Sequence, residues 1–375
     1  MRIAVNAIFL QKEKLEGYGW FVRESFRRLA RKYQEHQFYF IFDRPYDEEF
    51  IFEKNIKPIL VEPAARQVFA FKYWYDISAT RAVKKIKADV WVQPYGFCSL
   101  TSSIPQLLMV HDLAFKHFPQ HISWHQFLYY KWGTPKFLKK ATRVITVSEF
   151  SKQDILKHYP IDAAKISVIS GAARSEFQTL DREAKDAVKT EYANGKEYFL
   201  FVGGIQPRKN LMNLLKAFSL FKKWQKSNMK LLVAGRLAWQ YDDLIEKLKT
   251  YKYRDDVVML KWVSDERLVK IMGAAYALVY PSYFEGFGLP ILEAMQSSVP
   301  VITSNTSSMP ETAGNAALFA DPDDADAIAK QMLLLYKDEV LRNKKIESGK
   351  YRAASFSWDK TADQLWDNIL AIVEN

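Results

Sequence analysis

Short apolar runs alternate with amphipathic stretches along the whole chain. In the first half, the runs at residues 2–8, 37–42, 89–93, 106–110 and 143–147 are typical of buried strands. Between the first two runs, apolar residues with a helical spacing predict a helix over residues 20–32. Such alternation predicts a parallel sheet with helices on both of its faces.

The second half repeats the pattern after a polar stretch. Strands are predicted at residues 198–202, 229–234, 257–260 and 277–280, and the last amphipathic run predicts a helix over 358–373. A length of 375 residues favours two domains. We place the first at residues 1–175 and the second at 190–355, followed by a terminal helical segment at 356–375.

Two loops have the pattern strand, glycine turn, helix, which is typical of an anion site. One runs through Glu285-Gly286-Phe287-Gly288-Leu289-Pro290 into a predicted helix at 291–296, with a second carboxylate at Glu293. The other begins at Gly203-Gly204 and includes Arg208 and Lys209. Arg208 can bind phosphate oxygens in a bidentate manner, and Lys209 supplies a point charge.

The run FEGFGLPILEAM, together with Pro310-Glu311-Thr312-Ala313-Gly314, closely resembles the signature of family 4 glycosyltransferases. These enzymes retain the configuration of the donor sugar and carry a Glu-x7-Glu motif, here Glu285 and Glu293. The resemblance implies the α/β GT-B fold, in which two Rossmann-like, doubly wound domains face each other across a cleft. The first domain would bind the acceptor and the second the nucleotide sugar, and the terminal helix would cross back to the first. Many relatives have Arg where this chain has Gly204.

The resemblance also assigns roles to individual residues. His111, in Met109-Val110-His111-Asp112-Leu113, and Glu285 would act at the transferred sugar, and Asp112 is placed to orient the imidazole. The remaining predicted contacts are grouped by the part of the donor that they would bind. The diphosphate is assigned to Gly17, Gly19, Arg208, Lys209, Gly288 and Leu289, the sugar to His111, Glu285, Gly286, Phe287 and Gly288, and the nucleoside to Glu293, Trp262 and Val263. Trp262 could either stack on the base or cap the core.

The expected activity is retaining, metal-independent transfer of a hexose from a nucleotide diphosphate sugar to a hydroxyl of a glycan or lipid-linked acceptor. No carboxylate nucleophile stands out, which favours front-side attack with the leaving phosphate accepting the proton. The motifs look most like those of mannosyltransferases of surface-polysaccharide assembly, so GDP-mannose is the first choice of donor and a UDP-sugar the second. No cofactor is expected. The alternatives are a non-catalytic or epimerase-type nucleotide-sugar-binding protein, or a membrane- or RNA-binding protein acting through charge alone.

Two groups of residues have the composition of a metal site, but their sequence context argues against metal binding. His117, His121 and His125 are spaced by four, but Pro119 interrupts the helix that a zinc site would need. Asp321-Pro322-Asp323-Asp324 is better interpreted as a turn and a helix start. No metal site is therefore predicted.

Charge is uneven along the chain, whose net value is +11. Residues 64–143 hold twelve Lys or Arg against three Asp, and they are rich in aromatic residues. Such a surface suits an anionic membrane, although a solvated basic face over an aromatic core would have the same composition. No motif accompanies it that would indicate nucleic acid. A single cysteine, Cys98, fits a reducing compartment. With no secretory signal visible, we expect a cytoplasmic protein, with peripheral contact at the cytoplasmic face of the membrane.

Overall fold

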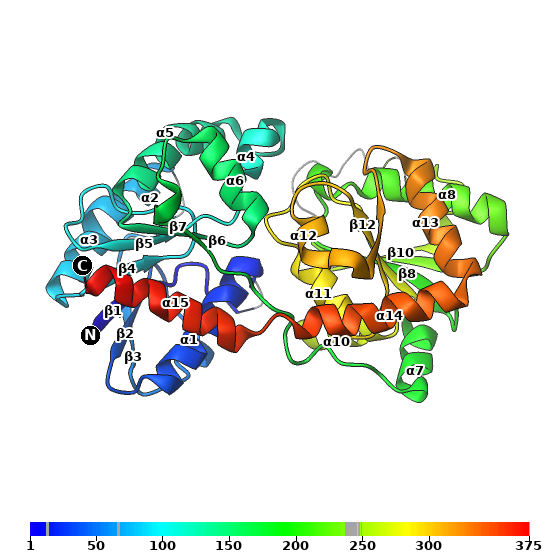
Figure 1. Cartoon of the computed structure of the whole chain (residues 1–375), viewed down its shortest axis with the longest axis horizontal. Coiled ribbons are helices and arrows are strands. Elements are labelled where there is room, and N and C mark those ends of the chain that lie inside the picture. Colours follow the sequence, from blue (N-terminus) through cyan, green and yellow to red (C-terminus); the bar gives the residue numbers. More distant parts are fainter. Residues whose placement is uncertain (13–14, 66–67, 237–245, 247, 249, 375) are drawn as a thin grey trace. The chain divides into compact units, whose positions relative to one another are not determined.

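The computed structural model describes residues 1–375 except 13–14, 66–67, 237–245, 247, 249 and 375. The chain divides into two compact units (Figure 1). The first comprises Met1–Gly171 and Ser357–Asn375, and the second comprises Ala172–Phe356. Each unit is built on its own sheet, and the described strand pairs of both sheets are parallel.

The first unit contains a sheet in the order β3-β2-β1-β4-β5-β6-β7. Its strands are β1 (Arg2–Asn6), β2 (Gln37–Phe42), β3 (Ile56–Leu60), β4 (Val90–Gln93), β5 (Gln106–Met109), β6 (Arg143–Thr146) and β7 (Ile166–Val168). Its helices are α1 (Gly17–Lys32), α2 (Val68–Tyr73), α3 (Thr80–Lys85), α4 (Ala114–His117), α5 (Trp124–Lys140), α6 (Glu149–His158) and α15 (Trp358–Val373). The C-terminal helix α15, drawn in red, lies beside α1 (Figure 1).

The second unit has the strand order β10-β9-β8-β11-β12-β13. The strands are β8 (Tyr198–Val202), β9 (Lys230–Ala234), β10 (Val257–Lys261), β11 (Ala277–Tyr280), β12 (Val301–Ser304) and β13 (Ala317–Ala320). The helices are α7 (Arg182–Ala193), α8 (Leu211–Gln225), α10 (Asp265–Gly273), α11 (Leu289–Gln296), α12 (Met309–Ala313), α13 (Ala325–Lys337) and α14 (Glu339–Ala354). The helix α8 packs against α13, and α11 packs against α14.

Both sheets reverse their strand order at one point, between β1 and β4 in the first unit and between β8 and β11 in the second. Ligands of open α/β sheets bind beyond the carboxyl ends of the strands at such a point. In the second unit the two strands at this point lead directly into the two glycine loops. Because β8 pairs with β11, the topology brings together two loops that are far apart in sequence.

Some local predictions need correction. The helix predicted over residues 20–32 begins earlier, at Gly17, so Gly17 and Gly19 lie in the first turn of α1. The first strand ends at Asn6, and the edge strand β3 was not predicted. Pro58 in β3 obscures the strand pattern, because proline weakens a strand prediction and is tolerated mainly at a sheet edge.

Residues 172–189, which the predicted bounds leave to the end of the first domain and the gap after it, belong to the second unit. The side-chain amide of Gln296 on α11 donates to the backbone oxygens of Arg174 and Phe177. Leu180 packs so closely on Gly273 of α10 that a Cβ there would lie 2.8 Å from Leu180 Cγ. These contacts hold the polar segment against α10 and α11, although its composition alone resembles that of a connecting loop.

Among the residues that the structure describes, none of the helices combines the length and apolar character needed to cross a membrane.

Candidate active site

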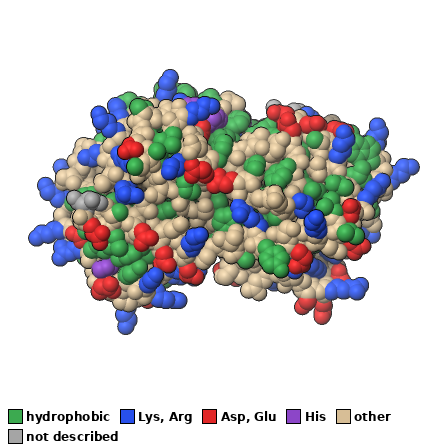
Figure 2. Space-filling model, in the orientation of Figure 1, with side chains coloured by type: hydrophobic (Ala, Val, Ile, Leu, Met, Phe, Trp, Pro, Cys, Tyr) green, Lys and Arg blue, Asp and Glu red, His purple; other side chains and the backbone are tan. Residues whose placement is uncertain are grey.

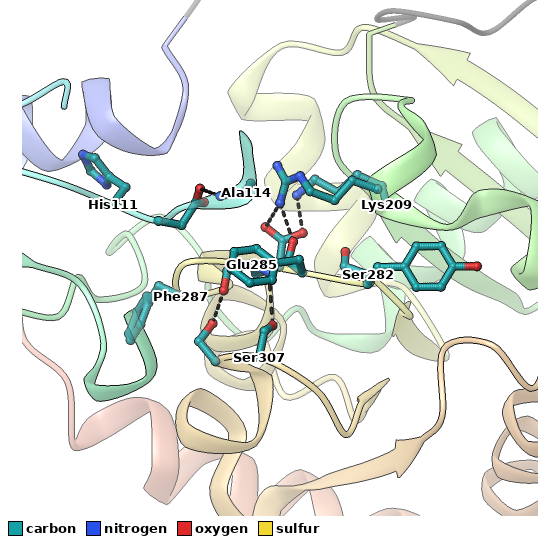
Figure 3. Close-up of polar contacts among 12 residues, drawn as sticks. His111, Ala114, Lys209, Ser282, Glu285, Phe287 and Ser307 are labelled. Atoms are coloured by element: carbon teal, nitrogen blue, oxygen red, sulfur yellow. Dashed lines mark hydrogen bonds and ion pairs between the residues drawn. The ribbon is translucent and has the colours of Figure 1, made fainter. Parts of the chain in front are cut away.

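Glu285 lies in the loop that leaves β11 and enters α11. Both of its backbone groups are held by the segment that follows β12. Its N–H donates to Ser307 Oγ at 3.1 Å, and its carbonyl oxygen accepts a hydrogen bond of 2.8 Å from Ser308 Oγ. Figure 3 shows this arrangement, with the carboxylate directed toward Lys209. The side chain is therefore fixed in position by a neighbouring strand's loop as well as by its own.

The carboxylate of Glu285 contacts two cations from the other glycine loop. Lys209 Nζ lies 2.7 Å from Oε1, and an Arg208 guanidinium nitrogen lies 3.3 Å from Oε2. Lys209 also donates to the Tyr280 hydroxyl at 2.8 Å, and Arg208 donates to the carbonyl oxygen of Phe284. The structure thus joins Glu285, Arg208 and Lys209, which the sequence assigned separately to the sugar and the diphosphate.

Burial alone would raise the pKa of Glu285, but the charges of Lys209 and Arg208 outweigh it and lower this pKa to about 2. The ordinary value is 4.5, so the unfolded chain takes up this proton at a higher pH than the folded protein does. The carboxylate therefore stabilises the fold above pH 4.5, and this contribution is lost as the pH falls toward 2.

We expect the free energy of unfolding to fall less steeply with acidification between about pH 4.5 and pH 2 in Glu285→Gln than in the wild type. Urea unfolding at several pH values measures the two slopes. Glu266→Gln is the matched control, because Glu266 is exposed near the start of α10. Equal slopes for the wild type and Glu285→Gln would contradict the prediction.

The glycines of the two loops are needed for close approach and for backbone conformation. A Cβ on Gly235, directly after β9, would lie 1.8 Å from the carbonyl oxygen of Gly203, so the turn after β9 could not approach the Gly203 loop. Gly203 has a φ of 140°, and a Cβ there would contact the Lys209 side chain. Gly288 precedes α11 with a φ of 96°, in the left-handed region that favours glycine. The positions of Lys209 and of the α11 N-terminus thus depend on these three residues.

Replacing Gly288 by Ala should destabilise the protein by about 1–2 kcal/mol, because an L-residue is strained at this φ. The new Cβ would also lie 3.1 Å from Ile291 Cδ1. Thermal or chemical unfolding gives the measurement. Gly204→Ala is the matched control, since its backbone has no positive φ and its Cβ would meet no described atom within 4 Å. Equal stability of the two variants would show that Gly288 is not strained.

Glu293 is buried on α11 and contacts Arg174, which sequence analysis missed. Arg174 Nε lies 2.8 Å from Glu293 Oε1, and an end nitrogen lies 2.7 Å from Asp265 Oδ1 at the start of α10. Burial raises the pKa of Glu293, and the charge of Arg174 opposes that rise. Arg174 follows the stretch Ser170-Gly171, where no motif pointed to a charged contact, so sequence offered no signal for it.

The predicted nucleoside contacts Trp262 and Val263 lie between β10 and α10. Trp262 is 48% exposed, with the Arg236 guanidinium 5.6 Å from its ring centroid. Trp262 is therefore too exposed to cap the core. Asp265, at the start of α10, connects this turn with Glu293 through Arg174.

His111 lies in the first unit, directly after β5, with its ring nitrogen Nε2 2.9 Å from the carbonyl oxygen of Pro94. Burial lowers the pKa of His111, so the imidazole is neutral near pH 7 and donates its Nε2–H to Pro94. The expectation that Asp112 orients the ring is wrong. Asp112 Oδ1 instead accepts a hydrogen bond of 2.9 Å from the N–H of Ala114, the first residue of α4 (Figure 3).

The first turn of α1 lies beside His111. Tyr18, between Gly17 and Gly19, packs edge-on against the His111 ring with centroids 5.8 Å apart. A Cβ on Gly19 would lie 2.7 Å from Leu15 Cδ2, which accounts for glycine at this position. The first unit therefore joins three of its predicted site residues at the carboxyl end of its sheet, while Glu285 and its partners form a second group in the other unit.

Gly286, Phe287 and Leu289 complete the predicted loop around Gly288. The carbonyl oxygen of Phe287 accepts from the Thr312 hydroxyl, and the Phe287 ring packs edge-on against Phe356. Leu289 begins α11, as the predicted anion site requires.

The Asp321–Asp324 segment forms a turn, and Asp324 caps α13 by accepting from the N–H groups of Asp326 and Ala327, as predicted.

Two family models match the chain. "Glycosyltransferase Family 4" matches residues 16–174, and "Glycosyl transferases group 1" matches residues 182–352. Among curated proteins, the O-antigen chain mannosyltransferase B of Escherichia coli is 32% identical over 255 residues, covering 68% of this chain and 67% of that protein. The O-antigen chain mannosyltransferase RfbU of Salmonella typhimurium is 34% identical over 232 residues, covering 60% of this chain and 61% of that protein.

Solved structures share the fold at low sequence identity. Sucrose-phosphate synthase from Thermosynechococcus elongatus superposes with a TM-score of 0.78 at 20% identity, covering 99% of both chains. The glycosyltransferase WaaG gives 0.77 at 15% identity and covers 98% of this chain and 99% of its own. Two parallel α/β units with these neighbours define the GT-B fold of glycosyltransferases. With the sequence matches, the chain belongs to the family 4 glycosyltransferases.

Proposed function

We propose that the protein transfers mannose from GDP-mannose, with retention of configuration, to a hydroxyl of a glycan or lipid-linked acceptor in surface-polysaccharide assembly. The observation that carries this proposal is the contact of Glu285 with Lys209 and Arg208 just before the α11 N-terminus. It combines a carboxylate for sugar hydroxyls with two cations for a diphosphate. The choice of mannose rests on the printed names of the two O-antigen relatives.

The ion pairs suggest how donor binding prepares the site. A donor diphosphate would bind Lys209 and Arg208, the same two cations that Glu285 contacts. It would therefore compete with the Glu285 carboxylate for them. Glu285 would then be able to accept hydrogen bonds from the donor sugar. The backbone N–H groups at the start of α11 and the two cations would stabilise negative charge on the leaving diphosphate. We propose that these groups act in place of a divalent cation, so that transfer does not depend on Mg²⁺.

Transfer would proceed by front-side attack. The acceptor oxygen forms a bond to the anomeric carbon on the face from which the diphosphate oxygen departs. The bond between that carbon and the diphosphate breaks, and its electron pair remains on the diphosphate. Because the new bond forms on the face from which the diphosphate departs, configuration is retained. The leaving phosphate takes the proton of the acceptor hydroxyl. His111, neutral and held by Pro94, would contact the transferred sugar from the first unit.

A thermal-shift screen against GDP, UDP, ADP and their common sugar conjugates, with and without Mg²⁺, tests donor binding. A donor at 100 times its dissociation constant stabilises the fold by about 2.7 kcal/mol. We expect the largest shift with GDP-mannose, equal with and without Mg²⁺. The nuclear magnetic resonance spectrum of the product then tests retention, and an inverted anomeric centre would refute it. A shift with UDP-sugars only would mean that the donor is a UDP-sugar and not GDP-mannose. The solved structure of Anabaena HepE, which has a similar fold, contains UDP and glucose.

Two alternatives predict different results. An epimerase would convert the donor with no acceptor present, and a non-catalytic binding protein would show the thermal shift without turnover. A protein that acts through charge alone would bind anionic surfaces in a salt-dependent manner and would not distinguish among nucleotide sugars. Incubation of the donor alone, followed by separation of the sugar nucleotides, decides between the first two.

We also propose that α5 contacts an anionic membrane at the cytoplasmic face. Its side chains Trp124, Leu128 and Trp132 recur every four residues and are 65%, 51% and 40% exposed. Lys136 lies 3.8 Å from the Trp132 ring centroid. Figure 2 shows Lys and Arg side chains projecting around this unit, with hydrophobic side chains exposed between them. Other aromatics of the region, such as Tyr129 and Phe137, pack around Phe97 in the core.

Vesicle sedimentation tests the membrane contact. Vesicles with anionic lipid should bind the protein, and neutral vesicles or added salt should weaken binding. Trp132→Ala should release the protein, whereas Trp224→Ala, at an exposed position on α8 of the other unit, should not. Equal binding to neutral vesicles, or equal loss in both variants, would contradict this contact.

A further inference from the structure

Two helices of the first unit bring together two histidines and an aspartate that have no role in the proposed transfer. His117 is the last residue of α4, and Asp154 and His158 lie one turn apart on the same face of α6. His117 Nε2 lies 2.8 Å from Asp154 Oδ2 and 3.0 Å from Oδ1. His158 Nε2 lies 3.4 Å from Oδ1. One ligand atom of each residue lies within 4.8 Å of the other two.

A hydrogen-bonded His–Asp pair explains only part of this arrangement. The bond between His117 and Asp154 accounts for one imidazole. The other imidazole, that of His158, has its Nε2 buried and 3.4 Å from the same carboxylate. Among the described residues this nitrogen makes no hydrogen bond of acceptable geometry. The carboxylate itself is only 7% exposed. Two imidazole nitrogens converging on one buried carboxylate are the donor set of a cation site.

The site could not be found from the spacing of the histidines. The candidate set His117, His121 and His125 fails because α4 ends at His117 and α5 begins only at Trp124. His125 is exposed at the start of α5, with its ring stacked on Trp124. The actual partners of His117 come from α6, about 40 residues later, and only the packing of α4 and α6 shows this.

We propose that His117, Asp154 and His158 bind a divalent transition-metal ion, with Zn²⁺ the first choice. Imidazole nitrogen and carboxylate oxygen are the common ligands of Zn²⁺, whereas Mg²⁺ and Ca²⁺ prefer oxygen ligands only. Three protein ligands leave one position of a tetrahedral ion for water. The side chains would have to move apart to admit an ion, because both nitrogens now lie within 3.4 Å of the carboxylate. His117 is one-third exposed at the end of α4, so its side chain has room to move.

The metal would tie together α4, which follows His111 in the chain, and α6, which contacts the His111 backbone. Asp112 accepts from the N–H of Ala114, the first residue of α4, and Ser151 on α6 donates to the carbonyl oxygen of His111 at 3.0 Å. A link from α4 to α6 through one ion would fix the end of α4 against α6. This role is structural and is separate from the charge balance of the diphosphate, so the site and Mg²⁺-independent transfer are compatible and are tested separately.

Zinc binding to the metal-free full chain, measured in competition with a chromophoric chelator and without any nucleotide, tests the site. We expect one tight site per chain. His117→Ala and His158→Ala should each weaken it by more than about tenfold, since loss even of an indirect metal partner costs that much. His125→Ala is the matched control, because it removes an exposed imidazole from the neighbouring helix, and it should bind zinc as the wild type does.

A second measurement covers the case in which these variants do not fold. Co²⁺ bound to the wild-type chain should give the visible absorption of a tetrahedral site, and added Zn²⁺ should remove it. His158→Gln, which keeps a polar side chain of similar length, should abolish this absorption. The proposal is overturned if the wild type shows no saturable Zn²⁺ or Co²⁺ binding. It is equally overturned if His125→Ala weakens binding as much as His117→Ala does.

Discussion

Replacing Lys209 by Met is expected to lower the rate of sugar transfer by about 100- to 1,000-fold, the usual cost of removing one group that stabilises charge in a transition state. Methionine is apolar and of similar length, so the variant removes the charge while largely preserving the packing. The ammonium lies 2.7 Å from Glu285 in a site from which water is largely excluded, where a single charge has a strong effect. Initial rates with a saturating donor give the measurement.

The control for this experiment is Lys216→Met, which removes an exposed lysine on α8 of the same unit. Lys209→Arg keeps the charge in a planar group of different shape, so it should recover part of the rate. A Lys209→Met protein that unfolds at the wild-type temperature and transfers at the wild-type rate would rule out a role for this ammonium in the reaction.

Replacing Arg174 by Ala is expected to lower the free energy of unfolding by about 3–5 kcal/mol, the cost of removing one partner of a buried ion pair. The Arg174 side chain is 8% exposed and contacts Glu293 at 2.8 Å and Asp265 at 2.7 Å. Without this guanidinium, Glu293 is left with its charge buried or must take up a proton. Chemical denaturation at neutral pH measures the loss.

Arg182→Ala is the control, because its side chain is 94% exposed and surface substitutions usually change stability by less than about 0.5 kcal/mol. The double variant Arg174→Met with Glu293→Leu removes both charges, so it should lose less stability than Arg174→Ala alone. If Arg174→Ala is as stable as Arg182→Ala, the ion pair does not hold this segment to α10 and α11. Donor binding, measured on the same proteins, shows separately whether Glu293 contacts the nucleoside.

The amino-acid sequence alone determined most elements and the chemistry of the second unit's loops. The predicted helix at residues 358–373 and the strand at 277–280 match α15 and β11. These elements follow from local periodicity, which a sequence displays directly. The same holds for the Glu285 and Lys209 loops, because glycine, charge and a following helix are contiguous there.

Only the tertiary structure decided which charges meet. Lys209 and Glu285 are 76 residues apart, Arg174 and Glu293 are 119 apart, and His117 and Asp154 are 37 apart. Such contacts depend on strand order and helix packing, and these have no local signature in a sequence. For the same reason the partner of His111 was predicted incorrectly. Its neighbour Asp112 is adjacent in sequence, but the carbonyl oxygen of Pro94, brought close by the pairing of β4 with β5, holds the ring.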